Sequence, residues 1–337
     1  MSEDPKIAVA RRLADDLLAP TAETTDVAPL VPITHLDALA AAGLYGLAAP
    51  IELGGVDAVA TRSIVRSIAG GCGATSFVWV QHLGSVAQIA HSPNTELRER
   101  HLAALTEGRT RAGIAFAHLR RRDPTGIRLT VGGDGGWRLD GSAPWVTGWG
   151  RIDVVRLGTV DKNRTLRWFL LPLDRPGFSA VPVALSVLAS TGTVELGLDD
   201  VPVSESDLIL EQPLDDWLAA DRPISSRVSP GVLGVIDRVL RHLDEREPGV
   251  AESLTRELAL LDSQDAAGDT DPRAMALHRA LCLDLGARST RALLAAVGGV
   301  GMELTHPAQR LAREAAFYVV QAQNAAGRAA TLDVAQR

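Results

Sequence analysis

Apolar residues recur with helical spacing at both ends of the chain and with strand spacing in its middle third. The helical patterns cover Val59–Ile68, Leu97–Leu105, Val232–Leu243 and the long apolar segment Ala274–Val297. Short runs that alternate or are rich in β-branched residues cover Ile127–Val131, Trp137–Asp140, Ile152–Leu157, Leu166–Leu171, Phe178–Val183 and Thr193–Leu198. The pattern predicts helices, then strands, then helices again.

The strands are separated by turn residues, such as Gly132–Gly136 and Asp161–Asn163, and no helix-length pattern interrupts them. A parallel sheet would need crossover helices, so we expect an antiparallel sheet. The predicted fold is α+β. It has an N-terminal helical domain over residues 1–112, a central antiparallel β-domain over 113–212 and a C-terminal helical bundle over 213–337.

Local signals refine the N-terminal third. Thr34-His-Leu-Asp37 resembles a capping box that opens a short helix ended by Gly43, and Asn94 is a candidate N-cap for the helix that follows it. The segment Ser67–Thr95 contains no Asp, Glu, Lys or Arg, but its second half holds several glutamines and histidines. That half is too polar to span a membrane, so we expect a buried helix.

Composition excludes several classes of protein. The 337 residues carry a net charge of −7 and only 4% aromatic residues, which argues against a nucleic-acid binder. Cys72 and Cys282 form no spacing motif, and the N-terminus has no apolar run, so we expect a reduced, cytoplasmic protein. Glu303 and His306 have the Glu-x-x-His spacing of di-iron bundles, but no second copy accompanies them, so we expect no metal site.

Several short motifs occur in a distinctive order. They are Gly43–Pro50 with Glu52–Gly55, Leu139–Gly141 with Pro144–Thr147, Val201–Val203, Gly298–Gly301 and Gln309–Ala315. In this order the chain resembles the acyl-CoA dehydrogenase family, which is flavin-dependent and has a small β-domain between two helical domains. The resemblance implies FAD as cofactor and a small-molecule substrate, with acyl-CoA a candidate. It also implies a homo-oligomer, dimer or tetramer, because the family shares its dinucleotide sites between subunits.

The resemblance implies five cofactor-binding residues. Trp145 and Thr147 correspond to the residues that flank the flavin ring, by packing and by a hydrogen bond respectively. Gly298, Gly299 and Gly301 correspond to a loop whose backbone approaches the dinucleotide. From the residues alone, a Trp145 that fills a seam between domains is the favoured interpretation, whereas the glycines could equally end a helix.

The chain departs from the family at the catalytic base. The usual glutamate lies nine residues past the arginine of the "R-[DE]-A" helix, and counting from Arg313 gives Ala322. The alternative position immediately precedes an arginine at the start of the third domain, where Ser226 precedes Arg227. Neither residue can accept a proton, and no acid occurs from Ala315 to Leu332 to replace them.

A second departure lies just before the strands. Where the family has a Thr-Glu pair and a Gly-Ser-Asp, residues 115–123 contain no hydroxyl residue but do contain His118 and three arginines, Arg120, Arg121 and Arg122. His118 is the remaining candidate for a catalytic proton carrier, although a lone histidine is more often structural. The arginines could meet phosphates of coenzyme A or a dinucleotide, or form a solvated face.

Three functions remain open. The first is an FAD-dependent oxidoreductase of acyl-CoA dehydrogenase type acting on an acyl thioester or a related small molecule. The second is a flavin monooxygenase on the same fold, which needs no α-proton base. The third is a non-catalytic subunit of a heteromeric dehydrogenase.

The chain is also shorter than the family between about residues 240 and 272. There the resemblance implies an "R-x-x-F-G" turn whose arginine reaches the partner subunit's FAD. This chain instead has the turns Arg246–Gly249 and Gly268–Asp271.

Overall fold

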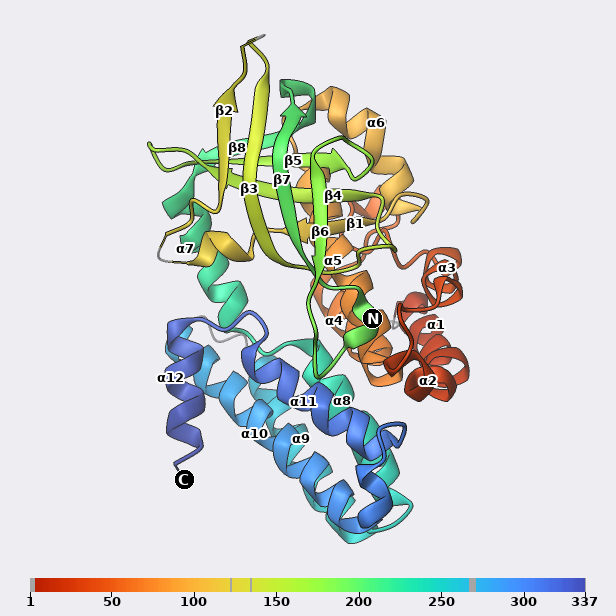
Figure 1. Cartoon of the computed structure of the whole chain (residues 1–337). Helices are drawn as coiled ribbons and strands as arrows, with labels where there is room; N and C mark the ends of the chain where they lie inside the picture. The colour runs from red at the N-terminus through yellow and green to blue at the C-terminus, as the bar shows by residue number, and fades with distance from the viewer. Residues whose placement is uncertain (1–3, 122, 134, 267–270, 337) are drawn as a thin grey trace.

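Helices enclose one end of the molecule and two β-sheets form the other (Figure 1). The computed structural model describes residues 4–121, 123–133, 135–266 and 271–336. The helix–sheet–helix order expected from the sequence is confirmed. Of the two turns proposed in the short segment, the first includes the start of a helix at Pro248, and the second, at Gly268–Asp271, lies mostly outside the described residues.

The N-terminal region consists of six α-helices. They are α1 (Pro5–Leu13), α2 (Ala22–Asp26), α3 (Ile33–Ala41), α4 (Ala58–Gly71), α5 (Gly73–Ala90) and α6 (Thr95–Thr106). Asn94 caps α6 as expected, because its side chain accepts a hydrogen bond from the backbone of Leu97 at 3.1 Å. The capping box predicted at Thr34 is wrong: α3 begins at Ile33, after Pro32, and has no side-chain cap.

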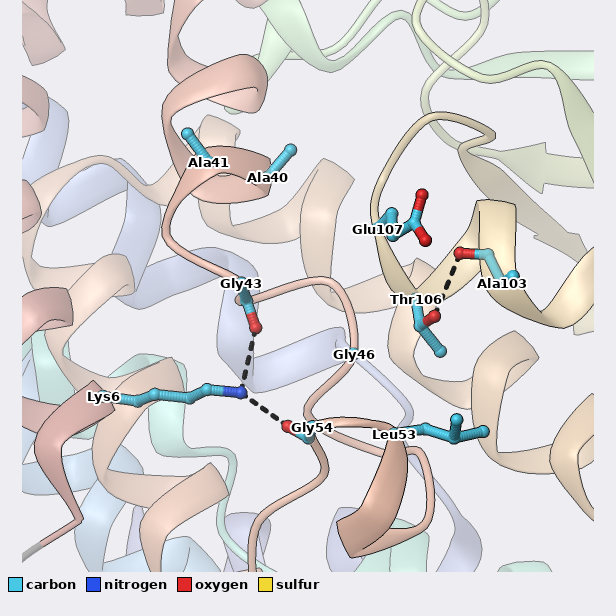
Figure 2. Close-up of a pocket in the computed structure, with 10 residues that line it drawn as sticks. All are labelled: Lys6, Ala40, Ala41, Gly43, Gly46, Leu53, Gly54, Ala103, Thr106 and Glu107. Atoms are coloured by element: carbon cyan, nitrogen blue, oxygen red, sulfur yellow. Dashed lines mark hydrogen bonds between the residues drawn. The ribbon is translucent and has the colours of Figure 1, made fainter.

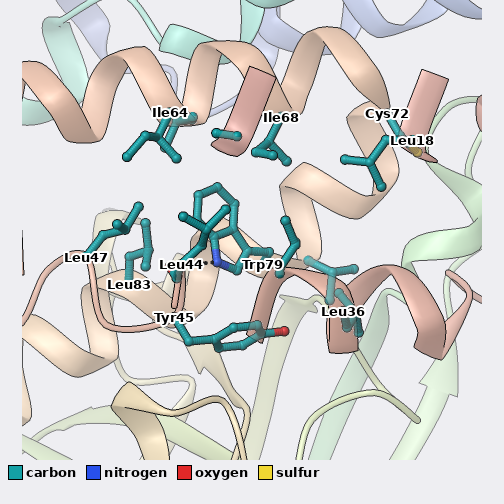
Figure 3. Packing of buried hydrophobic residues seen from close by; sticks show 14 of the residues in the cluster. Leu18, Leu36, Leu44, Tyr45, Leu47, Ile64, Ile68, Cys72, Trp79 and Leu83 are labelled. Carbon is teal, nitrogen blue, oxygen red and sulfur yellow. Dashed lines mark hydrogen bonds between the residues drawn. The ribbon is translucent and has the colours of Figure 1, made fainter. Parts of the chain in front are cut away.

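Helices α4 and α5 form the centre of the N-terminal core. Ile64 and Ile68 of α4 face Trp79 of α5 across buried leucines (Figure 3). The Trp79 indole N–H donates to the backbone carbonyl of Leu44 at 3.2 Å, so its only polar atom is satisfied. The uncharged segment therefore contains the end of α4 and all of α5, and α5 is the buried helix that was expected. No helix in the described part of the chain is long and apolar enough to cross a membrane.

Two four-stranded sheets follow, with strand orders β1-β4-β5-β8 and β2-β3-β7-β6. The strands are β1 (Ala112–Ala115), β2 (Ile127–Val131), β3 (Trp137–Val146), β4 (Val154–Val160), β5 (Thr165–Pro172), β6 (Phe178–Pro182), β7 (Val194–Val203) and β8 (Leu208–Pro213). The expectation of a wholly antiparallel sheet is wrong at one pair, because β1 lies parallel to β4. The hairpin β2–β3 provides the crossover between them, so no helix is needed.

In its described residues the C-terminal bundle contains six α-helices. They are α7 (Leu214–Ser226), α8 (Pro230–Asp244), α9 (Pro248–Ala266), α10 (Pro272–Val297), α11 (Pro307–Val320) and α12 (Ala325–Val334). Helix α8 packs directly on α4, backbone against backbone, through Gly70 and Gly234. A methyl group on Gly234 would lie 2.1 Å from the carbonyl oxygen of Arg66, so only glycine allows this approach.

Candidate functional site

Trp145 stands at the end of β3 with its indole 55% exposed. Its φ of 62° is in the left-handed region, which costs a non-glycine residue about 1–2 kcal/mol. Such conformations are often found at binding sites, where the surrounding structure holds them. The strained backbone and the exposed ring together offer a flat aromatic surface at the edge of the sheet.

Thr147 is buried, and its hydroxyl belongs to a chain of three threonines. The Thr147 and Thr193 hydroxyls lie 3.1 Å apart, those of Thr193 and Thr191 lie 2.9 Å apart, and Thr191 donates to the carbonyl of Leu188. A hydroxyl has one hydrogen to donate. Because Thr191 gives its hydrogen to Leu188, Thr193 must donate to Thr191 and Thr147 must donate to Thr193. Thr147 can therefore only accept a hydrogen bond from a ligand.

His118 lies in the interior, in the short 3₁₀ turn Ala117–Arg120. Its Nε2 lies 2.9 Å from the carbonyl oxygen of Gly158, which requires a hydrogen on Nε2, and burial lowers the pKa of the ring. Nδ1 is buried and has no partner among the described residues. This geometry gives His118 a structural hydrogen bond rather than access to a substrate. Arg121 is exposed, and Arg122 lies outside the described residues.

The two alternative base positions lie on neighbouring segments. Ser226 ends α7, and Ala322 lies in the α11–α12 loop with a left-handed φ of 51°. Asn324 of that loop donates from Nδ2 to the hydroxyls of Ser225 and Ser226, at 3.0 and 2.9 Å. The structure thus brings the two positions together, and both are neutral.

Arg279 of α10 holds together the junction between the end of α7 and the α11–α12 loop, which we call the α7 junction. Its guanidinium is buried and donates to the carbonyl oxygens of Ser225 at 2.8 Å and Tyr318 at 3.3 Å. It also donates to the carbonyl of Gln321, so it joins the end of α7 to the α11–α12 loop. Burial lowers the pKa of Arg279, and no carboxylate among the described residues pairs with it. No sequence motif singles out this residue.

A cavity of about 390 Å³ opens beside the same junction. It is lined by Arg120, Leu218, Asp221, Arg222, Ser225, Gln323, Asn324, Ala325 and Arg328. Arg120 and Asp221 form a bidentate ion pair across it, with nitrogen–oxygen distances of 2.9 and 2.7 Å. His118 does not line this cavity.

The glycine loop lies at the end of α10. Gly298 has a φ of 76° with ψ −154°, a conformation open to glycine alone, and no atom lies within 4 Å of a methyl group placed on Gly298 or Gly299. Gly301 is buried in the following 3₁₀ turn. Because Gly298 follows Arg279 by nineteen positions along α10, the loop is about 28 Å from the α7 junction along that helix. Within one chain the structure does not bring the two sites together.

A second cavity, also about 390 Å³, lies in the N-terminal region (Figure 2). The ammonium group of Lys6 donates to the carbonyls of Gly43 and Gly54, at 3.2 and 2.5 Å, and so closes the glycine-rich turn. The other lining residues are mostly small. The turn that contributes to the family resemblance is therefore held in shape by Lys6.

No group of three or more metal-ligating side chains occurs in the ranges that the structure describes. His306, which the Glu-x-x-His spacing singled out, has another role. Its Nδ1 accepts a hydrogen bond from the backbone of Ala308 at 3.1 Å and caps α11.

Comparison with known proteins shows what the chain is similar to. Residues 7–109 match the family model of the acyl-CoA dehydrogenase N-terminal domain. The chain is 23% identical to acryloyl-CoA reductase (NADH) of Anaerotignum propionicum over 255 residues, which are 71% of this chain and 65% of that protein, slightly under two thirds. It is 25% identical to cyclohexane-1-carbonyl-CoA dehydrogenase of Geobacter metallireducens, over 90% of this chain and 89% of that protein.

A solved structure shows the same fold over nearly the whole chain. It is a glutaryl-CoA dehydrogenase from Mycobacterium smegmatis in complex with FADH2, with a TM-score of 0.82 and 20% sequence identity. The match covers 98% of this chain and 93% of that one. Residues 7–109 thus match an acyl-CoA dehydrogenase N-terminal domain, and the fold of the whole chain is similar to that of a solved acyl-CoA dehydrogenase.

Proposed function

We propose that the chain is an FAD-dependent oxidoreductase of acyl-CoA dehydrogenase type that acts on an acyl thioester or a related small molecule. The observation that carries this proposal is the match of fold over 98% of the chain to a dehydrogenase solved with FADH2. The N-terminal family model and the relatives that act on CoA thioesters support the same substrate class. We also propose that it works as a homo-oligomer, a dimer or tetramer.

The residues present fit a flavin at two places. The exposed indole of Trp145 offers a face for the ring. The open space beside Gly298 and Gly299 lets a dinucleotide approach the backbone, although the Gly298 N–H itself donates to the carbonyl of Leu294 at 2.9 Å. Since α10 carries the glycines away from the α7 junction (Figure 1), a second copy of the chain would supply them to the same cofactor. A bound flavin would supply the acceptor for a hydride.

The proton step cannot use the chain's own side chains at either base position. Ala322 has no titratable group, and the Ser226 hydroxyl donates to the carbonyl of Arg222 and accepts from Asn324. The hydrogen bond between Asn324 and Ser226 orients the α11–α12 loop against the end of α7. The proton acceptor would therefore be a different side chain of this chain, the substrate, water or a group of another chain.

That same observation favours a second candidate, a non-catalytic subunit of a heteromeric dehydrogenase. In such a pair this chain needs no base of its own in place of the neutral Ala322 and Ser226, because the partner carries the base. The chain would then contribute its fold, and the Trp145 surface, to the assembly.

Flavin binding tests the proposal. The purified protein should be yellow or should bind added FAD, and Trp145→Ala should raise the dissociation constant of FAD about tenfold, because the ring loses its aromatic contact. Ile51→Ala, at an exposed apolar residue of the N-terminal region, is the matched control and should change nothing. Absorbance and fluorescence titration measure both.

The outcomes separate the candidates. Anaerobic bleaching of the flavin by an acyl-CoA supports the oxidoreductase, whereas bleaching that requires a second chain supports the subunit. Oxygen uptake driven by a flavin reductase would indicate a monooxygenase instead. A colourless protein that binds no FAD contradicts every flavin enzyme.

A further inference from the structure

The cavity between α7 and the α11–α12 loop has an unusual charge for this chain. The protein carries a net charge of −7, yet the lining of this cavity holds three arginines and one acid. The acid, Asp221, is already paired with Arg120. Two positive charges therefore remain without compensation in one concave site.

The uncompensated charges belong to Arg222 of α7 and Arg328 of α12. Neither guanidinium has a carboxylate within ion-pair distance among the residues that the structure describes, and both side chains are exposed. Other arginines of the described chain do have such partners, for example Arg164 with Asp215 and Arg175 with Asp207. Pairing within the fold thus does not explain why these two arginines meet at a cavity.

Arg279 increases the positive potential from behind. It lies beneath the same junction and is buried, and within the described residues its hydrogen bonds all go to backbone carbonyl oxygens, which carry no net charge. Charges that are partly removed from water interact more strongly than exposed ones. An anion in the cavity would be attracted by Arg222 and Arg328 directly and by Arg279 through the junction. A cation, or a wholly apolar group, would be disfavoured.

We propose that this cavity binds a small oxyanion, the carboxylate or phosphate group of a ligand, between Arg222 and Arg328. A guanidinium presents parallel N–H donors that match both kinds of oxyanion. Arg120, held in place by Asp221, provides a third donor at the rim. Neither the family match nor the two cofactor-binding loops assign this site.

The test measures binding of inorganic pyrophosphate and of succinate by isothermal titration calorimetry at low salt, with the full chain as isolated. We expect saturable binding of at least one of the two probes. Arg222→Gln and Arg328→Gln should each weaken it about tenfold, and the double variant more, since each removes charge-assisted hydrogen bonds. Both side chains are exposed, so the melting temperature should stay unchanged.

Arg291→Gln is the matched control, because Arg291 is an exposed arginine on α10 that lies outside the cavity. It should bind the probes within twofold of the parent chain. Tighter binding of pyrophosphate assigns a phosphate, and tighter binding of succinate a carboxylate. No saturable binding of either probe, or binding that survives the double substitution, overturns the proposal.

The existence of the anion site is independent of the proposed function, and only the identity of its ligand rests on that function. Anion binding by a chain that takes up no FAD would support the cavity and contradict the flavin enzyme. Where FAD does bind, competition between FAD and pyrophosphate places the cofactor's own phosphates in the cavity. If FAD and pyrophosphate bind independently of each other, the cavity is assigned to the substrate.

Discussion

The threonine chain behind Trp145 determines what Thr147 can do. Thr147 must give its hydrogen to Thr193, so it has none for a ring nitrogen that needs a donor. Thr193→Val removes that acceptor and should free the Thr147 hydroxyl to donate. One net hydrogen bond contributes about 1 kcal/mol, so we expect FAD to bind about fivefold more tightly. Fluorescence titration measures the dissociation constant.

Thr147→Val is the control for this prediction. If Thr147 only accepts, its loss should weaken FAD binding little, and the double variant should lose the gain seen with Thr193→Val. Weaker binding in Thr193→Val than in the parent chain would show that Thr147 already donates to the cofactor and that the order of donors is different.

At the residue scale, sequence motifs located side chains but not their hydrogen bonds. Trp145 and Thr147 were found from their place in a short motif, whereas the direction of the threonine chain depends on Thr191 and Thr193, from a separate segment. Arg279 was missed because it is one polar residue in an apolar segment and its partners are backbone carbonyls, which carry no sequence signal. The burial of His118 is likewise a tertiary property.

At the scale of elements, the contacts of Arg279 predict how strongly the end of α7 is held to the α11–α12 loop. Replacing it by leucine leaves the buried carbonyls of Ser225, Tyr318 and Gln321 without donors. Each orphaned buried acceptor costs about 1–3 kcal/mol, so we expect a loss of about 3 kcal/mol in the free energy of unfolding, measured by denaturant titration. Hydrogen exchange should rise in the α11–α12 loop.

Arg279→Lys separates the hydrogen bonds from the charge. Lysine keeps the charge but offers one ammonium group in place of a fork, so it should recover only part of the loss. Full recovery by lysine, or no loss with leucine, would contradict the anchoring role. Arg273→Leu, at an exposed arginine near the start of α10, should change stability little.

The elements themselves were predictable where periodicity is local. The order of helices and strands followed from apolar spacing, and the cap at Asn94 from one residue type. The parallel pairing of β1 with β4 was not predictable, because its partners, such as Ala112 and Val154, are 42 residues apart and β1 is only four residues long. The division into two sheets was not predictable for the same reason, since it depends on which strands pair across long stretches of sequence.

At the scale of the whole molecule, ion pairs join the N-terminal helices to the bundle. Arg310 of α11 is buried and bonds Glu23 at 3.1 Å and Glu314 at 2.8 Å, and Arg313 pairs with Asp26. Arg66 of α4 bonds both Asp237 and Asp262. The "R-[DE]-A" motif recognised in the sequence is thus a clamp between α11 and the first helices, and not a part of the candidate cavity.

His82 joins the helical region to the sheets and makes stability depend on pH. Its Nδ1 accepts from the backbone of Ala112, and its Nε2 donates to the carbonyl of Leu105, both at 3.0 Å. Burial lowers the pKa of His82 to about 4, whereas the unfolded chain has the ordinary value of 6.5. Between these values the unfolded state binds more protons, so stability is full above pH 6.5 and falls as the pH falls towards 4.

The shift of about 2.5 units corresponds to about 3 kcal/mol of unfolding free energy lost between pH 7 and pH 4 through this one residue. His82→Gln should be less stable at pH 7, because it loses two buried hydrogen bonds, yet its stability should fall less on acidification. Urea unfolding at several pH values measures the difference in slope. His91→Gln, at the exposed end of α5, should keep the parent slope. Equal slopes in the parent chain and His82→Gln would mean that other buried histidines cause the acid sensitivity.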